Sequence, residues 1–431
     1  MHTVKLIFLG AILGLIPEMV LAQNSTNSPY TRYGYGNLAD KAFISQRAMG
    51  GIGYGLRNPQ MINPMNPASF SAVDSMTFMF DLGLTGQISW FEDSFGKEQK
   101  NNGNLEYIAM QFPVAKKLGV GVGFEPVSYV GYGYMDTIRT NGDALAQNAY
   151  KGTGGQSRVY AIVSYDFLNK LSVGVKLSYM FGDIVHDKFN NVFTSSTANN
   201  YNTDWTDTIR SYGFMYDIGL QYHQSVGKFK TVTIGAVFSP KIRFGATVMT
   251  DTIRSGSDDQ SGTAIVLSRG NKTSHNAAFE MPASFGLGFT YNQLGKLTVG
   301  ADVLYQQWAS VKYNNQTGLF NNRLKLNTGG EFIPNRTSSN LLNKLHYRAG
   351  LYYTNSYLIV NDSKYKEYGI DLGLGVPIQD RRWQDKRSFV NIAFEYSLVQ
   401  PEVISFVKER YFKISLSYTF NELWFFKQKV Q

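Results

Sequence analysis

An apolar side chain recurs at every second residue in successive runs between Ser75 and Phe420, and this period of two constrains the fold more than any other feature. The first run carries Met76, Phe78, Phe80, Leu82 and Leu84. The positions between them are mostly small or polar, and similar runs occur at 172–179, 297–304 and 413–420. Because side chains of a strand alternate between two faces, each run predicts a strand with one apolar face.

Alternation alone is compatible with two all-β architectures. In a soluble sandwich, the apolar face packs on a core and the other face meets water. In an outer-membrane barrel, the apolar face meets lipid and the small or polar face lines the lumen. The length of the array and aromatic residues near strand ends, such as Tyr129, Tyr165 and Trp308, favour the barrel. We predict an all-β fold: a transmembrane antiparallel β-barrel of about 14 strands, each of roughly ten residues.

The predicted strands follow one another with connections of two kinds. They lie near 75–88, 104–113, 118–130, 156–166, 171–184, 211–223, 230–241, 281–292, 296–308, 323–333, 345–354, 366–376, 388–398 and 410–420. Connections after even-numbered strands are mostly tight, whereas those at 131–155, 185–210 and 242–280 are long. Short periplasmic turns that alternate with long extracellular loops are expected of such barrels.

Residues 1–22 are typical of a secretory signal peptide. Lys5 precedes an apolar run at 6–15, and the small residues at 20–22 form a cleavage site. A membrane-anchoring helix is the alternative, but the run is short and Pro17 interrupts it. No later stretch of about 18 apolar residues exists that would form a transmembrane helix. We therefore expect export to the bacterial outer membrane.

Residues 23–74 differ from the rest, because they are rich in Asn, Pro, Gly and Met and show little strand pattern. The Asn-Pro steps at 63–64 and 66–67 favour extended or turn geometry and interrupt any continuous helix. We predict that this segment is a hatch inside the lumen of a barrel formed by residues 75–420. Residues 421–431 are then a short periplasmic tail that rests on the membrane surface or, as a less favoured alternative, docks a partner.

Composition excludes several classes of function. The chain has no Cys, which excludes disulfides, Cys-ligated metal and a lipoprotein anchor. Its formal charge is +9, but the basic residues are scattered, so contact with anionic lipids and lipopolysaccharide is favoured over nucleic acid. No metal motif joins the five His residues, and we expect no cofactor and no metal.

Two glycine-rich repeats, at 51–55 and 119–123, have the spacing of dinucleotide-binding loops. Neither opens an amphipathic helix, and the second lies within a predicted strand. We expect glycines in the strands to relieve crowding where the hatch approaches the wall. There is no nucleophile elbow or phosphate-binding loop, so we do not expect an enzyme.

The sequence Asn66-Pro67-Ala68, after an irregular Gly-rich N-terminus, resembles the hatch motif of the FadL-type long-chain fatty acid transport family. The segments 236–241, 281–288 and 297–308 resemble the middle strands of that family in order and character. Ser28-Pro29-Tyr30 and the terminal stretch 421–425 are similar to members from Bacteroidota.

The resemblance implies a fourteen-stranded barrel with an N-terminal hatch and uptake of hydrophobic molecules, such as long-chain fatty acids, through a gap in the wall. It implies these ligand or hatch candidates: Asn66, Pro67, Ala68, Phe70, Arg47 and Arg57. With Lys41, the two arginines are the only hatch candidates for gripping a carboxylate, although ordinary lumen or solvent charges are the favoured interpretation.

Three functions remain open. A transporter, ranked first, predicts an apolar lumen pocket beside the hatch and a wall opening. A non-transporting subunit of an outer-membrane secretion or barrel-assembly complex, ranked second, predicts a filled lumen and an exposed apolar patch. An outer-membrane enzyme, well behind, predicts a convergent nucleophile and base at the outer rim.

Overall fold

The structure is a computed structural model of the whole chain. It describes residues 26–94, 96–140, 143–167, 169–192, 201–257, 264–270, 273–379, 387–403 and 406–423. The expected signal peptide and the residues from Trp424 onward lie outside these ranges.

Fourteen antiparallel strands form a closed barrel, as the sequence predicts. β2 (Thr77–Glu92) closes the ring by pairing along its whole length with β18 (Lys408–Leu423). The strands between them are β3 (Lys97–Ala115), β4 (Leu118–Thr140), β5 (Asp143–Phe167), β6 (Leu171–Val192), β7 (Tyr201–Gly227), β8 (Lys230–Ser239), β12 (Ser284–Gln293), β13 (Leu297–Gln306), β14 (Arg323–Phe332), β15 (His346–Asn355), β16 (Tyr365–Gln379) and β17 (Arg387–Pro401). Each predicted strand overlaps one of these.

The period of two separates the lumen from the outer face. In β12, Phe285, Leu287 and Phe289 are exposed on the outside, whereas Ser284 and Thr290 are buried inside. Apolar side chains that remain exposed along so many strands form an outer surface suited to lipid.

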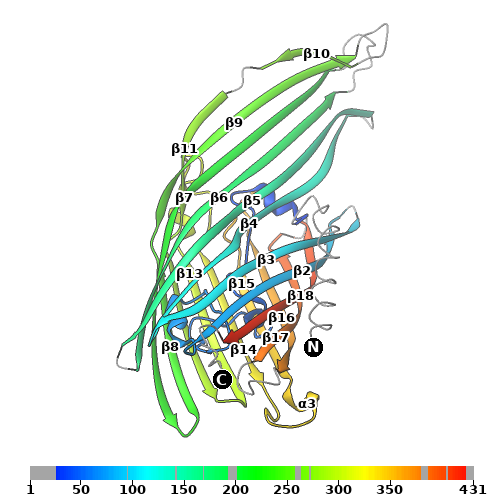
Figure 1. Cartoon of the computed structure of the whole chain (residues 1–431). Coiled ribbons are helices and arrows are strands. Elements are labelled where there is room, and N and C mark those ends of the chain that lie inside the picture. Colours follow the sequence, from blue (N-terminus) through cyan, green and yellow to red (C-terminus); the bar gives the residue numbers. More distant parts are fainter. Residues whose placement is uncertain are drawn as a thin grey trace, which may run out of the picture.

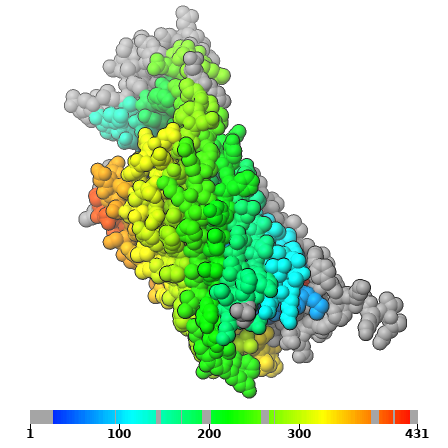
Figure 2. Space-filling model, turned by 90° about the vertical axis from the view of Figure 1, so that its left-hand side faces the viewer, coloured from blue at the N-terminus to red at the C-terminus, as the bar shows by residue number. Residues whose placement is uncertain are grey.

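Three connections that we expected to be long loops are largely strand, so this expectation was wrong. β4, β5, β6 and β7 extend far beyond the other strands, and β8 is continued by β9 (Ile242–Ser257). β10 (Ala264–Arg269) and β11 (Thr273–Met281) pair with β9. Figures 1 and 2 show the resulting tall sheet. Beyond the membrane neither face meets lipid, so these segments lack the apolar alternation that reveals a strand.

Outer-membrane barrels have short turns on the periplasmic side and longer connections on the extracellular side. The end with the tight turns is therefore periplasmic, and the end with the tall sheet is extracellular. At the periplasmic end β18 reaches Leu423, so the barrel ends three residues later than we expected, and residues 421–423 are strand, not tail.

The helices are short. They are the 3-10 helices η1 (Pro29–Arg32), η2 (Pro67–Ala72) and η3 (Trp308–Ser310), and the α-helices α2 (Ile44–Arg47) and α3 (Leu341–Lys344). Among the described residues, no helix combines the length and apolar character needed to cross a membrane.

The N-terminal segment lies inside the barrel (Figure 1). η2 contacts β4, β5, β6 and β7, and α2 contacts β16, β17 and β18, so the two helices reach opposite walls. The two-residue strand β1 (Asn37–Leu38) pairs with β4. The described part of the predicted hatch is therefore enclosed by the strands.

Candidate functional site

The hatch motif Asn66-Pro67-Ala68 forms the start of η2. The Asn66 side-chain oxygen accepts a hydrogen bond from the Ala68 N–H at 3.0 Å and so caps the helix. Its amide donates to the carbonyl oxygens of Tyr54, at 2.7 Å, and Leu220, at 3.1 Å. Because Leu220 belongs to β7, one fully buried side chain joins the helix, the preceding loop and the wall.

Wall glycines allow this close approach, which confirms the expectation for Gly119 and its neighbours. A Cβ at Gly119 would overlap the carbonyl oxygen of Phe70, and one at Gly219 would overlap the Asn66 side chain. A Cβ at Gly235 would overlap the Tyr54 carbonyl oxygen. The hatch backbone thus lies directly on the strand backbones, with no room for side chains between them.

Buried ion pairs fix both hatch arginines. Arg47 pairs with Glu106 of β3 at 2.7 Å, and both side chains are less than a tenth exposed. Arg57 pairs with Asp166 of β5 at 3.3 Å and donates to the Ser71 hydroxyl at 3.0 Å. The two arginines therefore contact different strands and do not converge on one anion site.

The charge of Arg47 is maintained by its surroundings. Burial by itself would lower its pKa, but the negative charges of Glu106, Glu395 and Asp40 outweigh burial and raise the pKa above its ordinary value. Arg47 thus remains a cation that neutralises buried carboxylates.

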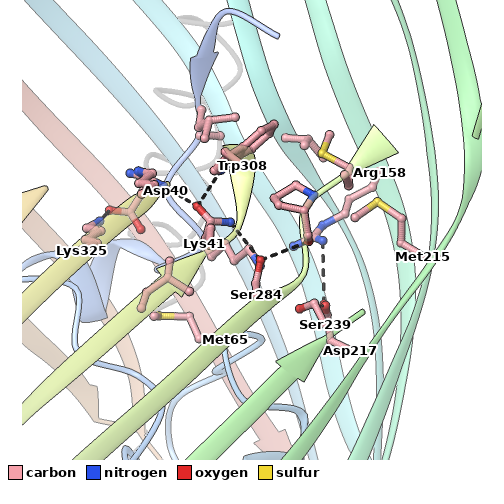
Figure 3. A pocket seen from close by; sticks show the side chains of 18 of the residues that line it. Asp40, Lys41, Met65, Arg158, Met215, Asp217, Ser239, Ser284, Trp308 and Lys325 are labelled. Carbon is pink, nitrogen blue, oxygen red and sulfur yellow. Dashed lines mark hydrogen bonds and ion pairs between the residues drawn. The ribbon is translucent and has the colours of Figure 1, made fainter. Parts of the chain in front are cut away.

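A small cavity of about 80 Å³ remains between the hatch and the wall (Figure 3). Asp40 and Lys41 line it from the hatch side, and Asp40 pairs with Lys325 of β14 at 2.6 Å. On the wall side Arg158 of β5 pairs with Glu125 of β4. The rest of the lining is mixed in character and includes Met65, Met215, Asp217, Ser239, Ser284 and Trp308. This volume holds a few water molecules at most.

The lumenal carboxylates and their partners were not singled out from the sequence. Three of them, Arg158, Glu125 and Lys176, lie at inward-facing positions of strands. A charged residue on the lumenal face of an alternating strand is the one sequence signal that could have identified them. Their pairing depends on register between strands, which the sequence alone does not supply.

The wall is interrupted beside the cavity. β7 pairs with β8 up to Ile218, and its pairing with β9 begins only at Tyr212, so residues 213–217 have no strand partner on that side. Pro240, which lacks an N–H, separates β8 from β9. The Ser239 hydroxyl bonds the Asp217 carboxylate across this interruption.

No metal site is evident in the described ranges, since they contain no group of three or more His, Asp or Glu side chains that could hold an ion.

The fold is shared, at low sequence identity, with solved structures of a FadL homologue and of toluene transporters. A Pseudomonas aeruginosa FadL homologue has a TM-score of 0.58 and 13% identity, covering 89% of this chain and 98% of that one. The P. putida toluene transporter TodX gives 0.57 and 14%, covering 91% and 100%. The Ralstonia pickettii toluene transporter TbuX gives 0.55 and 15%, covering 88% and 98%. This is the FadL-type fold of an outer-membrane protein.

No curated protein sequence matches the chain. Residues 4–431 match the BamG family. With nearly the whole chain matched, this FadL-like outer-membrane barrel belongs to the BamG family.

Proposed function

We propose that the chain is a non-transporting barrel subunit of an outer-membrane barrel-assembly complex. The BamG designation supports an association with barrel assembly. It therefore favours the second-ranked function of the sequence analysis over the transporter that we ranked first.

The observation that carries this proposal is the filled lumen around residues 38–65 of the hatch, away from the extracellular end. Small-molecule sites usually enclose about 300–1,000 Å³, whereas the cavity there is about 80 Å³. Moving the hatch to enlarge it would separate buried ion pairs such as Arg47–Glu106, and loss of one partner from such a pair costs about 3–5 kcal/mol. A lumen closed in this way suits a structural subunit better than a passage.

We assign Asn66, Pro67, Ala68, Phe70, Arg47 and Arg57 to holding the hatch in place and not to binding a ligand. Their contacts support this assignment, because each candidate packs on, or bonds to, a wall strand or the hatch itself. The role is non-enzymatic and needs no cofactor.

The remaining elements of the proposal concern the surroundings. The exposed apolar side chains contact outer-membrane lipid, and the scattered basic side chains contact lipopolysaccharide. Residues 1–22 direct export, residues 23–74 form the hatch, and a short tail follows β18 in the periplasm. A source among the Bacteroidota fits the terminal sequences.

Depletion of the chain tests the function directly. We expect the amounts of other folded outer-membrane barrels to fall, as measured by heat-modifiable migration, and a tagged chain to retain stoichiometric partner proteins after gentle solubilisation. Re-expression of the intact chain should restore the barrels. Unchanged barrel levels together with a lone, lipid-loaded chain would overturn the proposal.

Transport of a hydrophobic compound is the second candidate, because the wall interruption at 213–217 lies beside the cavity. A Met215→Trp variant would fill the cavity. Reduced uptake of radiolabelled oleate or toluene, with normal barrel levels, would favour transport. If oleate and toluene uptake are the same with and without the chain, transport is excluded.

A further inference from the structure

β3 and β4 separate towards the extracellular end of the barrel. They pair only from Ile108 and Phe124 down to Ala115 and Leu118. Above this point β3 continues with β2, and β4 continues with β5 (Figure 1). One edge of β4 is consequently left without a neighbouring barrel strand.

The hatch covers the lower part of this edge. β1 pairs antiparallel with β4, Asn37 opposite Tyr129, and the Ala39 N–H donates to the Val127 carbonyl oxygen at 3.0 Å. The Thr31 hydroxyl accepts a hydrogen bond from the Gly131 N–H at 3.2 Å. The backbone N–H and C=O groups that point to this edge thus belong to the odd-numbered residues of β4. Along the lower part of the edge, β1 of the same chain already serves as the added strand.

Above Gly131 the same edge is free among the described residues. The backbone groups of Gly133, Met135 and Thr137 continue the odd-numbered series, and no hydrogen bond to the described part of the chain is made at these positions. Met135 is 69% exposed, and the space beside Gly133 is open. From Gly133 to Ile138 there is neither Pro nor Lys, the residues that commonly protect a sheet edge.

A cleft of about 740 Å³ lies along this edge. Its apolar surface comes from the hatch, the β2–β3 hairpin, β4 and a loop before β18, through Tyr30, Tyr33, Phe91, Tyr134 and Phe406. Lys97, Lys100 and Lys151 are part of its lining. The cleft therefore offers a hydrogen-bonding edge next to apolar contacts, the combination used when a partner adds a strand.

We propose that the free edge of β4, from Gly133 to Thr137, binds an extended segment of another polypeptide that adds a strand antiparallel to β4 and continues the pairing begun by β1. Alternate apolar side chains of that segment pack on the aromatic surface of the cleft. The edge lies in a cleft bounded by β3 and the hatch, so a slender segment reaches it but the wall of a second barrel does not. This inference rests on the proposed function, since it assigns the partner to the assembly complex.

A proline placed at the edge tests the proposal. In Met135→Pro the lost N–H faces the cleft, so the β4–β5 ladder remains intact. Met135→Ala is the matched control, because it shortens the side chain but keeps the N–H. Both full-length tagged variants are checked for heat-modifiable migration, which confirms folding. We expect Met135→Pro to retain at least tenfold less partner than wild type and Met135→Ala to retain it almost fully.

A second measurement does not depend on proline. Because the chain has no Cys, single cysteines at Gly133, Met135 and Thr137 can carry a photoreactive cross-linker, with Leu372 on the far wall as control. Cross-links to the co-purified polypeptide from the β4 positions but not from Leu372 are expected. Hydrogen exchange of the 132–139 peptide should slow at least tenfold in the complex.

The outcomes separate the two proposals. If wild type retains no partner polypeptide, the proposed function fails and the edge loses its occupant. If a partner is retained equally by Met135→Pro, with no cross-link and unchanged exchange at 132–139, the complex stands and the edge proposal is overturned.

Discussion

The N-terminal segment meets the barrel in two regions of opposite character. In the lumen, η2 and α2 lie directly on the wall, and two cavities that Asp40 lines hold about 80 Å³ each. At the extracellular end, η1 borders a cleft of about 740 Å³ beside an unpaired strand edge. The lumen is nearly filled around Asp40, whereas the extracellular cleft beside η1 is open. The difference argues for an attachment role over a channel role.

The stability of the barrel should be most sensitive to an added side chain where the hatch lies directly on the wall glycines. In Gly235→Val the new atoms would overlap the Tyr54 carbonyl oxygen, so the hatch must move away from β8. Overpacking costs about 1–3 kcal/mol and more when backbone is in the way, and we expect about 3 kcal/mol or more here. Urea unfolding, followed by heat-modifiable migration and protease cleavage of the hatch, measures it. Gly245→Val, in the open extracellular region, is the control and should change little.

Removal of a buried charge in the lumen should lower the free energy of unfolding more than removal of an exposed charge near the cleft. Arg47→Met leaves Glu106 buried without its cation and should cost about 3–5 kcal/mol of unfolding free energy. Lys97→Met removes a pair with Glu92 at 3.0 Å in which Lys97 is 70% exposed, and should leave the unfolding free energy almost unchanged. Equal losses in urea unfolding would remove the contrast between the two regions.

The barrel could be predicted from sequence where its strands meet lipid. The alternation from Met76 to Leu84 is explained by one face in lipid and one in the lumen, and β2 forms there. The upper parts of β6 and β7 escaped prediction because both of their faces leave the membrane. There the Thr206 hydroxyl donates a hydrogen bond to the Asp187 carboxylate on the neighbouring strand. Such polar contacts produce no alternating apolar pattern in the sequence.

The candidate site was predictable in its motif and not in its partners. Asn66-Pro67 was predicted as part of the hatch and as a break in any continuous helix. That Asn66 caps and Pro67 begins the short helix η2 was not predicted. The residues that hold it, such as Glu106 for Arg47, lie on strands far along the chain. Such pairs follow from barrel register and from the depth of the hatch, and local patterns specify neither.

The hatch cap offers a milder test of the same contrast. Asn66→Ala removes the cap of η2 and two hydrogen bonds to buried carbonyl oxygens, so about 2 kcal/mol should be lost. Asn340 caps the exposed helix α3 through the Leu342 N–H at 3.0 Å without such further bonds. Asn340→Ala should cost about 0.5–1 kcal/mol in the same urea titration. A larger loss at Asn340 would show that the lumenal contacts of Asn66 contribute little.

The smallest effect concerns pH and the pair between Asp40 and Lys325. Burial would raise the pKa of Asp40, but the charges of Lys325 and Arg47 and its hydrogen bonds from Lys325 and the Ala42 N–H lower it below the ordinary 3.8. A carboxyl whose pKa is depressed in the folded state stabilises that state above its ordinary pKa and loses this contribution as the pH falls. Wild type should therefore exceed Asp40→Asn in urea midpoint at neutral pH, and this advantage should shrink below about pH 4. An advantage that grows on acidification would mean that Asp40 does not hold the hatch as a charged partner of Lys325, and that the packing of η2 closes the lumen without it.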